Sequence, residues 1–301
     1  MFQLPSPLQP IENEWTKKFN VQVLVKRDDL IHPEVSGNKW RKLKYNIQEA
    51  MQQRKNTLLT FGGAFSNHIT ATAAAGKYLH LNTIGIIRGE EYDALNPSLQ
   101  FAKQCGMQLY YLSRKEYKNL RENNFDINNI NIDFNTPAND IYIIPEGGAN
   151  EFALIGCSEI VDEINVQLKE LNIPNFDFIF SACGTGATIA GISNRLQAPQ
   201  KAIGVAVLKH ETLKSEIMQK FPLLNTDFSI VEAHFGGYAK THPELIKFIV
   251  NFQQQHHIPL DFVYTGKLFY KLFNLIETGY FPSGATIIAV HTGGVMNAKV
   301  A

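Results

Sequence analysis

A run of small and polar residues at 181–188, Ser-Ala-Cys-Gly-Thr-Gly-Ala-Thr, could bind an anion. It follows an apolar stretch and opens a predicted helix. Small residues let backbone N–H groups converge on a negative charge, which the helix dipole also favours. Thr185 and Thr188 can add hydroxyl donors. The run therefore predicts a phosphate-binding loop, although a tight turn that serves packing alone would have the same composition.

Two common nucleotide-binding motifs do not fit this loop. It lacks the Gly-Lys-Ser/Thr of a Walker loop, and Ile189 stands where a dinucleotide fingerprint needs its third small residue. The next predicted strand ends in Lys209-His210, with no acidic residue for a ribose hydroxyl. The loop thus favours a simple phosphate group over a dinucleotide.

Lys39 ends the segment Ser36-Gly37-Asn38-Lys39, just before a predicted helix. A lysine in the first turn of a helix faces the positive end of the helix dipole, which ordinary surface sequences avoid. That field favours the neutral amine, the form that attacks carbonyl groups to make Schiff bases. The alternative is a solvated lysine in a basic segment that also holds Arg41, Lys42 and Lys44.

A third segment, 62–68, reads Gly-Gly-Ala-Phe-Ser-Asn-His and lies between a predicted strand and an alanine-rich helix. Ser66, Asn67 and His68 could together bind a carboxylate at the start of that helix. The commoner role of Ser or Asn at such a place is to cap the helix. His68 would then be a polar residue satisfied within the fold.

Two further segments near the C-terminus follow predicted strands. They are Tyr264-Thr265-Gly266-Lys267 and His291-Thr292-Gly293-Gly294. Either threonine hydroxyl could meet a ring nitrogen, and either could equally be a helix cap.

The elements that must position these segments alternate between strands and helices. Apolar runs predict strands at 21–25, 58–61, 83–87, 108–112, 141–144, 176–180, 203–208, 262–264 and 286–290. Helices are predicted at 39–51, 68–78, 98–105, 154–168, 188–196, 243–254 and 267–276. This order is typical of parallel sheets with helices on both faces, and ligands bind beyond the carboxyl ends of such strands. An Asn-rich stretch, 119–139, is expected to be a long surface excursion between two sheet-forming regions, either without regular structure or with a partial helix.

Composition excludes several classes of function. The 301 residues carry 28 Lys and Arg against 28 Asp and Glu, so there is no net positive field for nucleic acid or an anionic membrane. No apolar run approaches the roughly 20 residues of a membrane span. The first sixteen residues lack the basic and apolar zones of a signal peptide, so we expect the cytoplasm. Three widely spaced cysteines, Cys105, Cys157 and Cys183, predict neither a disulfide framework nor a structural zinc site.

Taken together, seven segments resemble the 1-aminocyclopropane-1-carboxylate deaminase and D-cysteine desulfhydrase family. They are Lys26-Arg27-Asp28-Asp29-Leu30, Ser36-Gly37-Asn38-Lys39, 62–68, Glu146-Gly147-Gly148, 181–188, Val263-Tyr264-Thr265-Gly266-Lys267 and 291–294, in order over nearly the whole chain. The resemblance implies pyridoxal 5′-phosphate (PLP) and the two-domain α/β fold of tryptophan synthase β, with open, mostly parallel sheets. It also implies a large domain from 1–45 and 143–301, a smaller inserted domain at 46–142, and a homodimer.

The resemblance also implies roles for residues. Lys39 would hold the cofactor covalently and carry the proton at the α-carbon of the substrate. Ser66, Asn67 and His68 look like the loop for the substrate carboxylate, with Asn67 also near the cofactor's phenolic oxygen. Tyr238 and Tyr264 resemble the two active-site tyrosines. The phosphate would be bound by Cys183, Gly184, Thr185, Gly186, Ala187 and Thr188, and the ring nitrogen by Thr265 or Thr292.

The sequence departs from the family pattern after Tyr264. Aminocyclopropane deaminases of this family carry Glu there, whereas this chain has Thr265. Trp40 and Phe65 also stand where smaller or more polar residues are common, which alters the expected pocket. We therefore predict a lyase that acts on a small amino acid, foremost D-cysteine, by α,β-elimination. The alternatives are ring opening of aminocyclopropane-carboxylate and, more remotely, a non-catalytic α/β protein that binds a nucleotide or another ligand.

Overall fold

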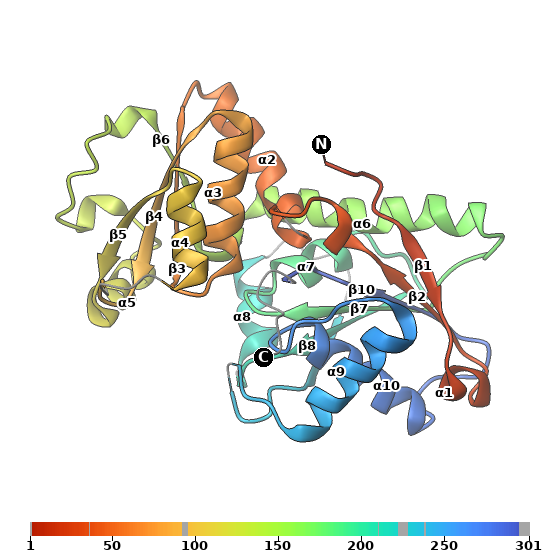
Figure 1. Ribbon diagram of the computed structural model, residues 1–301. Helices are drawn as coiled ribbons and strands as arrows, with labels where there is room; N and C mark the ends of the chain where they lie inside the picture. Colours follow the sequence, from red (N-terminus) through yellow and green to blue (C-terminus); the bar gives the residue numbers. More distant parts are fainter. Residues whose placement is uncertain are drawn as a thin grey trace. The chain divides into compact units, whose positions relative to one another are not determined.

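The computed structural model describes residues 2–35, 37–91, 96–209, 211–221, 228–237 and 239–294. The chain forms two compact units, one from Met1–Asn38 and Leu154–Ala301, the other from Lys39–Ala153. Each unit is a sheet with helices packed on it (Figure 1). The fold class predicted from the sequence is confirmed. The second unit contains the range 46–142, and the assignment of that range as an inserted domain stays a prediction.

The first unit contains a six-stranded sheet. Its order is β1 (Leu8–Ile11), β2 (Gln22–Lys26), β10 (Thr286–Val290), β7 (Phe178–Cys183), β8 (Lys201–Ala206) and β9 (Phe228–Glu232). All neighbours are parallel except β1, which pairs antiparallel with β2 in the register Leu8↔Lys26. Helices α6 (Glu151–Glu170), α9 (Pro243–His256) and α10 (Thr265–Glu277) pack around it (Figure 1). The shorter helices are α1 (Glu14–Lys18), α7 (Ala187–Ser193), α8 (Leu213–Lys220) and the 3₁₀ turn Asp28–Leu30.

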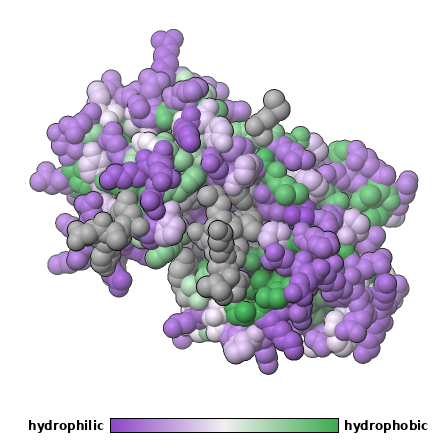
Figure 2. All heavy atoms as spheres, viewed as in Figure 1, coloured by the Kyte–Doolittle hydropathy of each residue, from purple (hydrophilic) through white to green (hydrophobic). Residues whose placement is uncertain are grey.

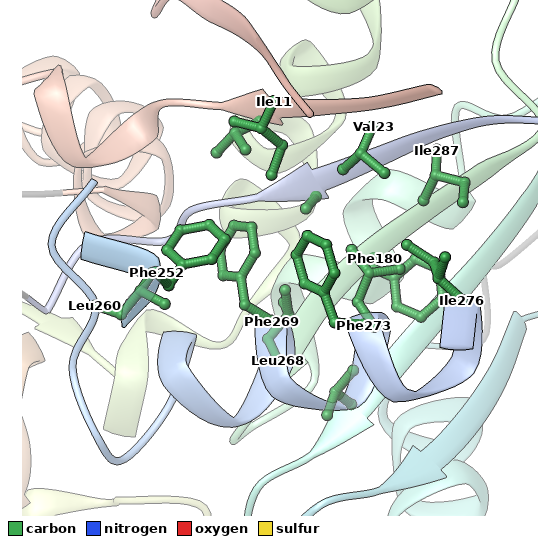
Figure 3. Packing of buried hydrophobic residues seen from close by; sticks show 14 of the residues in the cluster. Ile11, Val23, Phe180, Phe252, Leu260, Leu268, Phe269, Phe273, Ile276 and Ile287 are labelled. Carbon is green, nitrogen blue, oxygen red and sulfur yellow. The ribbon is translucent and has the colours of Figure 1, made fainter. Parts of the chain in front are cut away.

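The core of the first unit explains why α10 forms. Its buried side chains include Leu268, Phe269, Leu272, Phe273 and Ile276, which recur at the three- and four-residue spacing of one helix face. They meet aromatic and branched residues of the sheet and of α9 (Figure 3). This packing fixes the helix that has the predicted site residue Tyr264 as its N-cap and Thr265 as its first residue.

The second unit contains a four-stranded, fully parallel sheet. Its order is β5 (Gln108–Leu112), β4 (Asn82–Arg88), β3 (Thr57–Gly63) and β6 (Ile141–Ile144). Its helices are α2 (Asn38–Gln52), α3 (Asn67–Leu79), α4 (Pro97–Gln104) and α5 (Arg114–Glu122), with 3₁₀ turns at Ile127–Asn129, Ala138–Asp140 and Glu146–Gly148. Ile86 lies in one apolar cluster and Ile87 in another, as expected for a strand covered on both faces.

One predicted strand is wrong. Residues 262–264 form a turn, because the Asp261 carboxylate accepts hydrogen bonds from the backbone N–H groups of Val263 and Tyr264. This draws the backbone into the start of α10 and away from an extended conformation.

The surface in the view of Figure 2 is mostly hydrophilic. Among the helices of the described ranges, none combines the length and the apolar character that crossing a bilayer requires.

Candidate active site

The predicted phosphate loop joins β7 to α7 in the first unit. Gly186 is the N-cap of α7 with φ +81°, and no side chain caps this helix start. A Cβ at Gly186 would overlap Ile217 of α8, so both the backbone angle and the packing require glycine. The uncapped N–H groups of the first turn fit a phosphate group, which is the donor set expected from the sequence.

Asn38 links this loop to two other predicted segments. Its Nδ2 donates to the Thr188 hydroxyl at 2.8 Å, and both residues are buried. Its backbone N–H donates to the Thr292 carbonyl at 3.3 Å. Gly37 has φ +65°, and a Cβ there would overlap that same carbonyl. The close approach of these segments therefore fixes the residue from which the chain continues into Lys39.

Tyr264 lies beside the loop. A Cβ at Gly184 would be 3.5 Å from its Cε1 and 3.8 Å from its hydroxyl oxygen. The phenol is therefore close to the backbone that is predicted to bind phosphate. The second predicted tyrosine, Tyr238, and also Ser36 lie outside the described residues.

Thr265 and Thr292 differ in what their hydroxyl groups do. The Thr265 hydroxyl donates to Asp261 Oδ2 at 2.6 Å and accepts from the Asp261 N–H at 2.9 Å, and the residue is 0% exposed. Thr292 is 8% exposed, and no partner for its hydroxyl is found within the described ranges. Of these two hydroxyl groups, only that of Thr265 donates a hydrogen bond within the described residues.

Cys183 closes β7 and is 1% exposed. Its Sγ lies 3.7 Å from the Ser181 carbonyl and would be 2.7 Å from a Cβ at Gly204. The thiol is packed against β8, so this residue can offer the phosphate its backbone only.

In the second unit, Ser66 caps α3. Its hydroxyl oxygen accepts hydrogen bonds from the backbone N–H groups of His68 at 3.2 Å and Ile69 at 3.5 Å. Asn67 is the first residue of the helix. The capping role that the sequence left open is therefore present, and it places Ser66 and Asn67 at a helix start, where a carboxylate is favoured.

His68 is buried, with 1% of its surface exposed. The Thr60 hydroxyl donates to the Ile144 carbonyl at 2.9 Å, so it accepts from His68 Nε2–H, also at 2.9 Å. Nδ1 is then unprotonated, and it has no partner among the described residues. Burial, and after it the charges of Lys39 and Lys42, hold the pKa of His68 well below its usual value. His68 is a neutral imidazole close to the predicted cofactor lysine.

Asp261 and Lys267 were not predicted as site residues from the sequence. Asp261 accepts from three successive backbone N–H groups and the Thr265 hydroxyl. The available signal was an Asp four residues before a Thr at a helix start, a capping pattern that the expected strand at 262–264 hid. Lys267 gave no signal, because its partners are backbone carbonyls.

Comparisons with known proteins found a matching family model and similar relatives. The family model described as pyridoxal-phosphate-dependent enzyme matches residues 1–293. A protein of Pyrococcus abyssi that carries the provisional name 1-aminocyclopropane-1-carboxylate deaminase is 31% identical over 93% of this chain and 86% of its own. A mitochondrial protein of Arabidopsis thaliana, named bifunctional D-cysteine desulfhydrase/1-aminocyclopropane-1-carboxylate deaminase, is 32% identical over 91% of this chain and 73% of its own.

A solved structure is also similar. The crystal structure of a homologue of aminocyclopropane-carboxylate (ACC) deaminase superposes with a TM-score of 0.84 at 29% identity, covering 98% of this chain and 90% of that one.

Proposed function

The chain belongs to the family of pyridoxal-phosphate-dependent enzymes, and on this premise we propose that it eliminates the β-substituent of a small amino acid. Its relatives place it in the ACC deaminase and D-cysteine desulfhydrase group. It is a PLP-dependent lyase or deaminase. The alternative of a non-catalytic ligand-binding protein is therefore excluded. The proposed overall reaction converts D-cysteine and water to pyruvate, ammonia and hydrogen sulfide.

The residues of the first unit fit the cofactor. The backbone of the loop from Cys183 to Thr188 would hold the phosphate, and the Thr292 hydroxyl the ring nitrogen. Lys39, the first residue of the second unit, would bind the aldehyde carbon. When bound, PLP supplies an electron sink for the bonds at the substrate's α-carbon.

The protein's own groups position the substrate and move its protons. Lys39 takes the α-proton, while the neighbouring neutral His68 adds no positive charge beside it. Ser66 and Asn67, at the start of α3, bind the substrate carboxylate. The Tyr264 phenol, beside Gly184, binds substrate or moves a proton near the leaving group.

The hydrogen bonds of Thr265 are the observation that favours elimination over ring opening. In the aminocyclopropane deaminases of the family that this chain resembles, a Glu follows the tyrosine. Here Thr265 is enclosed and bonded through its hydroxyl to the Asp261 carboxylate, so a glutamate would place a second carboxylate beside Asp261. The neutral Thr292 hydroxyl, which would meet the ring nitrogen instead, would leave that nitrogen largely unprotonated and the electron sink shallower. Loss of a good leaving group such as thiolate tolerates this better than opening an unactivated ring.

Ring opening of ACC is the second candidate. The names of the relatives from P. abyssi and A. thaliana favour it, and the latter is named for both reactions. This substrate has no α-hydrogen, so Lys39 could not begin by removing one. The reaction would have to start at the ring.

Assays of both substrates side by side, at saturating PLP, test the proposal. We expect pyruvate and sulfide from D-cysteine, with little or no 2-oxobutanoate from ACC. Lys39→Ala is the control and should form neither product. Efficient 2-oxobutanoate formation by the unmodified protein would overturn the argument from Thr265.

We further propose a homodimer located in the cytoplasm. The dimer rests on the family resemblance, and light scattering of the purified holoenzyme would test it. Fractionation of cells of the source organism would test the location.

A further inference from the structure

Lys267 is a buried lysine with an unusual set of partners. It lies in the first turn of α10 and is 0% exposed. Its Nζ lies 3.3 Å from each of three backbone carbonyl oxygens, those of Val207, His234 and Gly237. None of these belongs to α10, and no described carboxylate forms a salt bridge with this ammonium group.

Burial of the Lys267 ammonium group costs free energy, and a lysine on the surface would not carry this cost. Removing an ammonium group from water is unfavourable, and burial lowers the pKa of Lys267 while the nearby Asp261 raises it. Three carbonyl acceptors match the three N–H donors of an ammonium group and offset part of that cost. The arrangement therefore stabilises the positions of the carbonyl groups and of α10 relative to one another.

The three carbonyls lie in segments that follow neighbouring strands. Val207 comes directly after β8, and His234 and Gly237 are the two ends of a turn after β9. The turn is closed by the Gly237 N–H, which donates to the His234 carbonyl at 2.9 Å. Within it Phe235 has φ +48°, a left-handed conformation that is unfavourable for a residue other than glycine. Its ring lies 5.9 Å from the ammonium group.

Tyr264 lies one helical turn before Lys267. On its other side, Asp261 accepts the backbone N–H of Tyr264 at 2.6 Å. The start of α10 is thus held from two directions, by a carboxylate that binds its N–H groups and by an ammonium group that ties it to the ends of β8 and β9. The Tyr264 ring, beside Gly184, lies between these two attachments along the chain.

We propose that Lys267 is a positioning residue, whose hydrogen bonds to the Val207, His234 and Gly237 carbonyls hold the Tyr264 phenol at its place beside the phosphate loop. The proposal rests on the proposed function, because it takes Tyr264 to act on the substrate. Lys267 itself touches neither substrate nor cofactor in this scheme.

The first test observes Tyr264 directly. 3-Fluorotyrosine is incorporated at position 264 of the full-length holoenzyme, and its ¹⁹F resonance is compared in the wild type, Lys267→Met and Lys271→Met. Methionine keeps the length of the side chain and removes the ammonium group. Lys271, one turn further along α10 and not fully buried, is the matched control. We expect a displaced or broadened resonance in Lys267→Met and an unchanged one in Lys271→Met. An unchanged resonance in a folded Lys267→Met overturns the proposal.

The second test is a double-mutant cycle on turnover. Lys267→Met should lower kcat about tenfold or more, because a small misplacement of an active-site group is costly. In a Tyr264→Phe background the same change should cost less than about twofold if Lys267 acts through Tyr264. Equal losses in both backgrounds overturn the proposal.

The two tests separate this proposal from the proposed function. If Tyr264→Phe alone keeps wild-type turnover, the proposed role of Tyr264 is wrong, whereas the ¹⁹F resonance still decides whether Lys267 positions the ring. If Lys267→Met does not fold, Lys267→Arg takes its place. Arginine keeps the charge but moves the donors, so the resonance should shift in a folded protein, and an unshifted one contradicts the proposal.

Discussion

Two threonines with similar sequence surroundings have different chemistry in the folded chain. Both follow short strands or turns near the C-terminus, and the sequence left open which of them meets the ring nitrogen. The Thr265 hydroxyl is held by Asp261 on both its donor and its acceptor side, whereas the Thr292 hydroxyl is not. The residue type alone could not decide this, because the deciding partner, Asp261, lies in a segment expected to be a strand.

Valine at each position separates the two roles. Thr265→Val should lower the free energy of unfolding by about 1–3 kcal/mol, because it leaves a buried carboxylate short of a donor. Thr292→Val should leave that free energy nearly unchanged and shift the visible absorption of bound PLP. Urea unfolding and absorption spectra of both variants measure this. A spectral shift in Thr265→Val without loss of stability would reverse the assignment.

His68 gives the folded chain a defined response to acid. Its pKa is lowered in the folded state, chiefly by burial, so below its usual value near 6.5 the unfolded chain binds a proton that the folded chain does not. Stability should therefore fall as the pH decreases below this value, by at most about 1.4 kcal/mol per pH unit from this residue.

His68→Gln should remove this part of the acid sensitivity, since the amide can still donate to Thr60 and does not titrate. His80→Asn, at the exposed left-handed end of the same helix, is the control and should keep the wild-type slope. Urea midpoints between pH 5 and 8 provide the comparison. Parallel slopes for the wild type and His68→Gln would show that His68 is not the group responsible.

At the scale of elements, the sequence predicted most of the sheet strands and missed those with weak local signals. The bounds of β5, β6 and β10 agree with the predicted ranges, because these strands are short and strongly apolar. β1 contains Pro10, which argues against a strand except at an edge, where β1 lies. β9, Phe228–Glu232, is a short run in which Ser229 and Glu232 interrupt the apolar residues, and no strand was predicted there.

The Asn-rich stretch, 119–139, is another segment whose structure was only partly predicted from its sequence. It was expected to run over the surface with a partial helix as a possibility, and α5 does occupy its first part, but Phe125, Ile130 and Phe134 pack on one face of the four-stranded sheet. These apolar residues are irregularly spaced among asparagines, so neither the helical nor the strand period reveals them. Tertiary packing, and not a local hydrophobic period, determines the structure of such segments.

The phosphate loop makes a prediction at this scale. Gly184 does not have a positive φ, and a Cβ there would make only normal contact with Tyr264, so Gly184→Val should fold. Its side chain should nevertheless block the approach of the phosphate and cause loss of PLP. Gly106→Val, at an open position with φ +91°, should lower stability yet retain the cofactor. PLP stoichiometry after dialysis measures both. Full retention in Gly184→Val would support the alternative that the turn serves packing only.

At the scale of the whole molecule, each unit contains some of the residues that are predicted to act on the cofactor or the substrate. The first contains the phosphate loop, Tyr264 and Thr292, and the second begins at Lys39 and contains Ser66 to His68. The sequence identified these segments because glycines and polar residues stand out after apolar strands. It could not identify Asp261 or Lys267, whose importance comes from backbone groups that fold close to them.

The central claim is that this PLP enzyme holds its cofactor on Lys39. Reduction of the holoenzyme with borohydride, followed by peptide mapping, tests this most directly, because it converts the cofactor's covalent bond into a stable label. We predict a single pyridoxyl group per chain, on Lys39, and no label in Lys39→Ala, which should still fold. A pyridoxyl group on Lys42, Lys44 or Lys267 of the wild-type protein would contradict the account.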